Sequence, residues 1–194
     1  MTHTNTVLKF SLLALSLGMM SSAAQAAVDG QVQITGSINS GTCDVLPENQ
    51  NVEVALGSVG VDTFAAGLGT NSTLVPFDIT LTDCVAGNND EGTPIDKVAI
   101  TFSGMEDSTV SGLGGLIAAG GPDTAQGVGV RLFDNDGSTK IGINDGISYN
   151  QQTMGGVADD IIMNFFAAYE ATGAGNLVKA GNANSVAQFE LTYL

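Results

Sequence analysis

Two cysteines, Cys43 and Cys84, are the residues with the most definite chemistry in this chain of 194 residues. Both lie after a secretory leader, described below, and in an oxidising compartment an even pair of cysteines typically forms a disulfide. A metal site is the alternative, but the one histidine, His3, lies inside the leader. The sequence therefore predicts a Cys43–Cys84 disulfide.

Catalytic side chains are sparse. Without a histidine after the leader, and with both thiols in a disulfide, Ser-His-Asp and Cys-His arrangements are excluded. The adjacent carboxylates Glu106-Asp107 and Asp159-Asp160 lie in stretches expected to be loop-like, and neighbours on a strand would point apart, so neither forms an acid–base pair. We predict that the protein is not an enzyme.

Two motifs resemble ligand loops and fail on inspection. The segment 104–126 is glycine-rich but lacks the Gly-Lys-Ser/Thr ending of a phosphate loop. Asp134, Asp136 and Gly137 resemble a calcium loop that has lost its terminal glutamate. Asn135-Asp136-Gly137 is instead typical of a hairpin turn. The sequence predicts no cofactor and no metal.

Residues 1–26 have the features of a secretory signal peptide. Lys9 precedes an apolar run from Phe10 to Met20, and Ala24-Gln25-Ala26 is a small-residue cleavage site. The run is too short to span a bilayer, and no second apolar run of spanning length follows. We expect an exported protein that is not membrane-embedded, with an uncleaved anchor as the alternative.

The chain is strongly acidic, with 20 acidic residues, 5 basic residues and a formal net charge of −15. So few cations cannot form a basic stripe for phosphates, which excludes nucleic acid as a partner. The acidic residues indicate a solvated, self-repelling surface.

Glycine richness (26 residues) and period-two alternation predict an all-β fold. Pro76 should lie near a strand start or on an open edge. Residues 161–169, apolar at nearly every position, should form a central strand buried on both faces. Segments 57–73 and 104–126 should be connections. The expected strands cover residues 51–56, 74–84, 97–102, 128–132, 140–143, 161–169 and 187–193.

A further alternating stretch covers residues 29–38, ahead of Cys43, where domains are commonly frayed. We interpret it as a strand that completes the fold of a neighbouring subunit; an ordinary first strand of its own domain is the alternative. One face of this strand carries Val28, Gly30, Val32, Ile34, Gly36 and Ile38.

Taken together, four blocks resemble the pilin subunits of chaperone–usher fimbriae, especially the major subunit of type 1 fimbriae, while segment 104–126 matches poorly. They are Gly30-x-Val32-x-Ile34-x-Gly36-x-Ile38 with Cys43-x-Val45, Pro76-Phe77-Asp78-Ile79-x-Leu81-x-Asp83-Cys84, Gly127-Val128-Gly129-Val130-x-Leu132 and Ala168-Tyr169-x-Ala171-Thr172-Gly173. The end of the chain resembles the family as well: Tyr193 is next to last and Gly181 is fourteenth from the C-terminus, the pairing this family uses for chaperone binding.

The resemblance implies an all-β, incomplete immunoglobulin-like sandwich that lacks its last strand and is completed by donor-strand complementation. It divides the chain into a signal peptide (1–26), an N-terminal donor-strand extension (27–40) and a pilin domain (41–194). The donor strand would present Val28, Gly30, Val32, Ile34 and Gly36, with Gly30 at the site where the family requires no side chain. The chaperone-binding and groove strand would present Gly181, Ala187, Phe189, Leu191 and Tyr193.

The implied partners are neighbouring pilin subunits, a periplasmic chaperone and an outer-membrane usher. We therefore expect a structural subunit that passes through the periplasm to the cell surface and polymerises head to tail into the shaft of a fimbria used in cell adhesion. The alternatives are a minor adaptor or tip-associated pilin, and a secreted β-sandwich carbohydrate-binding module. A family adhesin would carry an extra lectin domain and no N-terminal extension.

Overall fold

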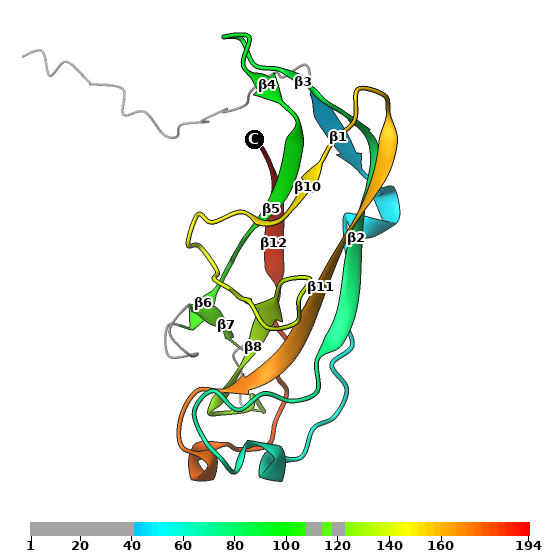
Figure 1. The fold of residues 1–194 in the computed structure, drawn as a ribbon. Helices are drawn as coiled ribbons and strands as arrows, with labels where there is room; N and C mark the ends of the chain where they lie inside the picture. Colours follow the sequence, from blue (N-terminus) through cyan, green and yellow to red (C-terminus); the bar gives the residue numbers. More distant parts are fainter. Residues whose placement is uncertain (1–40, 108–113, 118–122) are drawn as a thin grey trace, which may run out of the picture. The chain divides into compact units, whose positions relative to one another are not determined.

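The computed structural model describes residues 41–107, 114–117 and 123–194 (Figure 1). The predicted signal peptide and donor-strand extension lie outside the described residues. Within them the chain is nearly all β, with three short 3-10 helices, η1 (Pro47–Asn49), η2 (Val61–Phe64) and η3 (Gly175–Leu177).

Two sheets form the body. The larger has the order β1-β2-β11-β8-β7-β6, with β9 also paired to β8; the smaller has the order β10-β5-β12, and β3 and β4 form a separate hairpin. The larger sheet comprises β1 (Thr42–Val45), β2 (Val75–Val85), β6 (Glu106–Asp107), β7 (Gly115–Ile117), β8 (Val128–Phe133), β9 (Lys140–Ile141) and β11 (Asp159–Ala171). The other strands are β3 (Gly87–Asn88), β4 (Pro94–Ile95), β5 (Lys97–Gly104), β10 (Tyr149–Thr153) and β12 (Ala187–Tyr193).

The core lies between the two sheets. Alternate residues of β2 and β11 pack against those of β5, because successive side chains of a strand point to opposite faces. The rings of Phe102 on β5 and Phe165 on β11 meet edge to face with centroids 5.3 Å apart, and Phe77 stacks on Phe165 at 5.6 Å. The predicted strand at 74–84 is confirmed, and Pro76 is its second residue, where a missing N–H is tolerated.

Strand β11 is central, as predicted, since it pairs with both β2 and β8. The predicted burial of both faces holds only in its second half, where Ala167, Ala168, Glu170 and Ala171 are all buried. In the first half Ile162 is 58% exposed. The apolar run alone did not distinguish these halves.

The prediction that 104–126 is a connection was wrong in part, because β6 and β7 lie within it and β7 pairs with β8. Leu116 of β7 is buried in the core. Strands of two or three residues among glycines are too short to show alternation. The carboxylates Glu106-Asp107 and Asp159-Asp160 accordingly lie in strands rather than loops.

The turn at Asn135-Asp136-Gly137 joins β8 to β9, as predicted. The Asp136 carboxylate accepts hydrogen bonds from the backbone N–H groups of Ser138 and Thr139 and from the Thr139 hydroxyl, and these bonds hold its pKa well below the usual range. The carboxylate therefore serves the turn. In the described part of the chain, no three Asp, Glu, His or Cys side chains are grouped so as to hold a metal ion.

The predicted disulfide is confirmed: Cys43 on β1 is bonded to Cys84 on β2, across a sequence separation of 41 residues. The bond fastens the edge strand β1 to the larger sheet.

We expect the Cys43→Ala/Cys84→Ala variant to lose about 4 kcal/mol of unfolding free energy, since a loop of this length restricts the unfolded chain by that amount. Urea unfolding of the oxidised protein and the variant measures the loss, and the reduced parent protein is the control. A difference below about 1 kcal/mol would show that the bond adds little to the two paired strands.

Candidate functional site

Strand β12 leaves one of its edges open. Among the described residues it pairs with β5 alone. Its predicted apolar face, Ala187, Phe189, Leu191 and Tyr193, packs against the core yet remains only partly buried. A core-facing strand with half-exposed apolar side chains indicates that a covering element is absent from one side.

The opposite rim is formed by residues 51–57. Val52, Val54 and Leu56 are partly buried against the core, and their sequence neighbours are exposed, as the alternation predicted. The prediction of a paired strand here was nevertheless wrong: no backbone hydrogen bond joins residues 51–57 to another described segment. The alternation predicts which side faces the core, but it does not supply a pairing partner.

A groove of about 1450 Å³ lies between these two rims. Residues 50–57 and 183–190 form its sides, and apolar side chains of both sheets form its floor. The floor residues are Phe77, Ile79, Phe102, Leu116, Val130, Leu132, Ala167 and Tyr169. Two unpaired backbone rims over an apolar floor are suited to receive one extended strand, which would pair on both sides.

The two ends of the groove differ. Near the C-terminal end of β12, the Tyr193 hydroxyl accepts a hydrogen bond from the Cys43 N–H (2.9 Å) and donates one to the Cys43 carbonyl (3.2 Å), which ties β12 to β1. At the other end the groove adjoins a second pocket of about 440 Å³, and Gly57, Ala183 and Asn184 line both. The groove is therefore closed at one end and continuous with a pocket at the other.

Gly181 lines this second pocket and precedes β12. A Cβ at Gly181 would overlap the backbone of Asp123 and Ala125. Glycine is thus required here by close backbone approach, whatever its part in chaperone binding.

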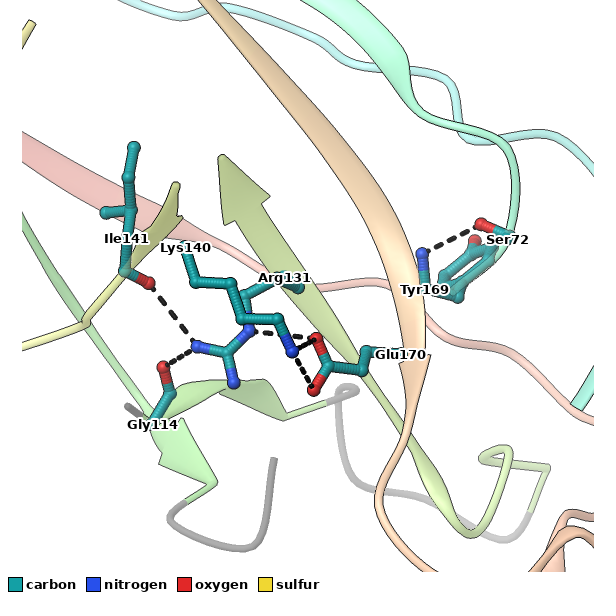
Figure 2. A network of polar contacts seen from close by, with 7 residues as sticks. All are labelled: Ser72, Gly114, Arg131, Lys140, Ile141, Tyr169 and Glu170. Atoms are coloured by element: carbon teal, nitrogen blue, oxygen red, sulfur yellow. Dashed lines mark hydrogen bonds and ion pairs between the residues drawn. The ribbon is translucent and has the colours of Figure 1, made fainter. Parts of the chain in front are cut away.

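A buried polar cluster, which the sequence analysis missed, stabilises the sheet beneath the groove (Figure 2). Arg131 on β8 and Glu170 on β11 are both fully buried, and the Arg131 Nε donates to Glu170 at 3.1 Å. Lys140 Nζ contacts the same carboxylate at 3.0 Å. Arg131 also donates to the carbonyls of Gly114 and Ile141. The signal was present: the chain's single arginine lies in a run of buried β residues.

Arg131 alternates with Val130 and Leu132, which line the groove, so its side chain projects from the opposite face of β8. The cluster joins β8, β9, β11 and the residue before β7. Close by, the Tyr169 N–H donates to the Ser72 hydroxyl at 3.0 Å and anchors the 57–73 connection to β11 (Figure 2).

A two-sheet β-sandwich with an uncovered apolar groove beside its last strand defines the class of fimbrial subunits, or pilins. The family model described as "Fimbrial protein" matches residues 32–194. The chain belongs to this fimbrial family and is a structural subunit of a fimbria, which confirms the resemblance seen in the sequence.

Curated relatives agree over nearly the whole chain. The "Probable major fimbrial subunit LpfA" of Escherichia coli O157:H7 is 33% identical over 184 residues, covering 95% of this chain and 94% of that protein. The "Type-1 fimbrial protein subunit" of Serratia marcescens is 35% identical over 186 residues, covering 94% and 96%. These relatives place the chain among the subunits of surface fimbriae.

Solved structures show the same fold. The P pilus rod subunit PapA superposes with a TM-score of 0.60 at 19% identity, covering 78% of this chain and 99% of that one. A type I fimbria protein of Burkholderia pseudomallei gives 0.53 at 28% identity, covering 78% and 88%. No helix in the described ranges is long and apolar enough to cross a membrane.

Of the predicted site residues, Ala187 and Phe189 line the groove, Leu191 and Tyr193 continue the same face toward the closed end, and Gly181 lies at the second pocket. The predicted donor-strand residues lie outside the described ranges. The second rim, residues 51–57, was not assigned to the site in the sequence analysis.

Proposed function

We propose that this subunit builds the shaft of a fimbria by donor-strand exchange, in which the groove accepts the N-terminal extension of a neighbouring copy. The supporting observation is the pair of unpaired rims, residues 51–57 and β12, on either side of an apolar floor. Eight residues on each rim span about 26 Å in extended form. The proposed donor segment 28–36 is of matching length.

The energetics favour this use of the extension. Burial of Val28, Val32 and Ile34 would contribute about 5–9 kcal/mol at ~1.5–3 kcal/mol each, before ordering costs. Backbone bonds to the two rims add ~0.5–1.5 kcal/mol apiece. Assembly then requires neither a cofactor nor a nucleotide, because a better-fitting strand replaces a poorer one.

The open groove also accounts for the proposed partners. An uncovered apolar edge is a template for aggregation. A periplasmic chaperone would cover β12 until, at an outer-membrane usher, the extension of the next subunit takes its place. The alternation on β12 and the tie between Tyr193 and Cys43 keep this edge ordered for both exchanges.

A shaft role is favoured over an adaptor role by the relatives, since LpfA is described as a probable major subunit. Abundance in sheared surface fibres distinguishes the two: a shaft subunit dominates the preparation, whereas an adaptor is scarce.

Hydrogen exchange tests the proposed assembly step. We expect the amides of residues 28–36, and the rim amides of 51–57, to become protected when subunits assemble into fibres, because both would enter the same ladder. The N–H groups of Asp134 and Gly137 in the β8–β9 turn, already bonded within the subunit, are the control. Unchanged exchange of both segments on assembly would contradict the proposal.

A further inference from the structure

We propose that the end of the subunit at the open side of the groove is a docking surface for the body of the copy that donates the strand. This inference rests on the proposed donor-strand exchange. The surface, called here the η pole, comprises η2, η3 and the chain around Leu68 and Lys179; both short helices lie at the bottom of Figure 1.

The two ends of the groove set the direction of the inserted strand. Tyr193 and Cys43 close the end near the C-terminus of β12, so a strand entering the groove must have its free terminus there. Cleavage after Ala26 would place that free terminus one residue before Val28. The donor's chain therefore leaves the groove at the opposite end, where the second pocket opens between Gly57 and Ala183.

The length of the connection then places the donor's body. Five Cα steps separate Gly36 of the donor strand from Gly41, the first described residue, and they span at most about 18 Å. The donor's Gly41 thus lies within that distance of the acceptor's groove exit. A body attached so closely must lie against the η pole.

The composition of the η pole fits such a contact. Three large apolar side chains around the exit are exposed: Val61 (45%), Leu68 (62%) and Leu177 (57%). Val61 also lines the second pocket, and the Gly69 N–H bond to the Ala171 carbonyl holds Leu68 beside the start of the η3 connection. Apolar side chains gathered at one end of an acidic protein are typical of a protein-binding surface.

The donor would present the surface around its own Gly41. Gly41 lies against Gly87 of the β3–β4 hairpin, so that a Cβ at Gly41 would overlap the Gly87 nitrogen. The Ala86 N–H bonds the Gly155 carbonyl, which places the neighbouring Val157, 77% exposed, on the same end. An apolar side chain is thus available on this end to meet the η pole.

Charge contributes less than apolar contact. Lys179 on the η pole is exposed and would face the exposed hairpin carboxylates of Asp90 and Glu91. Asp62 and Asp123 also lie on the η pole, which therefore has no excess of positive charge. We rest the inference on the apolar residues and on the connection length.

Hydroxyl-radical footprinting of the unaltered chain tests the docking surface. Fibres are compared with free subunits saturated with a synthetic peptide spanning residues 27–38, so that the groove is filled in both samples. Oxidation of Leu68 and Leu177 should fall about fivefold in fibres, in proportion to the area lost in an interface core. Met105, 66% exposed on the chain after β5, is the reference within the same molecule.

A surface variant provides the second measurement. The substitutions Val61→Ser/Leu68→Ser/Leu177→Ser should increase the fraction of subunits released from fibres by a fixed guanidinium concentration about tenfold. The matched control is Met105→Ser/Ile147→Ser/Ile162→Ser, three equally exposed apolar residues elsewhere. Equal oxidation of Leu68 and Leu177 in both samples, or equal release from the two variants, would overturn the docking surface.

Failure of the proposed function itself has a different signature. If the 27–38 peptide does not protect the 51–57 amides from exchange, the groove does not accept the extension. Protection of those amides with unchanged Leu68 and Leu177 refutes the docking surface alone.

Discussion

The Ile34→Asp variant is expected to form no fibres, while its disulfide-bonded subunit still accumulates in the periplasm. Ile34 is a pocket-filling residue of the proposed donor strand. Its loss removes ~1.5–3 kcal/mol of apolar burial, and desolvation of an unpaired carboxylate over the apolar floor adds several kcal/mol more. The subunit's own groove is unaltered, so its capture by a chaperone should persist. Electron microscopy and the periplasmic subunit level are the two measurements.

Thr35→Asp is the matched control, because it introduces the same charge one residue later on the opposite face of the strand. We expect this variant to retain fibres. Abundant fibres from Ile34→Asp, or loss of fibres from both variants alike, would show that residue 34 does not enter an apolar groove.

The largest stability effect is expected from Arg131→Met. The guanidinium is fully buried, pairs with the buried Glu170 and satisfies two backbone carbonyls. Removal of one partner of a buried ion pair typically costs about 3–5 kcal/mol; because Lys140 still contacts Glu170, we expect the lower figure. Urea unfolding of the subunit saturated with the 27–38 peptide measures the change.

Lys140→Met serves as the comparison, since its side chain is 26% exposed and water can replace it. Its effect should stay near or below about 1 kcal/mol. The double variant Arg131→Met/Glu170→Met should regain part of the loss, because no buried carboxylate is then left with a single partner. If Arg131→Met and Lys140→Met proved equally mild, solvent would have to reach the cluster.

Much of this architecture follows from alternation. The strands β2, β5 and β12 were predicted because one face of each packs on the core and the other does not, which is the pattern that period two detects. The disulfide followed from the number of cysteines and the leader. The partly buried face of β12 also identified the side on which the groove lies.

Other features depend on tertiary contacts that a local pattern does not encode. Residues 51–57 alternate like a strand but lack a partner, since pairing is a property of two segments. The strand β10, Tyr149–Thr153, is largely polar and was not predicted; it pairs with β5 in a register that shifts within the strand. Burial of Arg131 beside Glu170 depends on the neighbouring positions of β8 and β11 in one sheet.

The tie between Tyr193 and Cys43 has a consequence for precursor processing. A groove blocked at that end accommodates a bare amino terminus but has no passage for a leader still attached ahead of Val28. An unprocessed copy would retain a working groove yet be unable to fill anyone else's. Leader removal would then license a molecule to extend the polymer, and a stray precursor would act as a chain terminator.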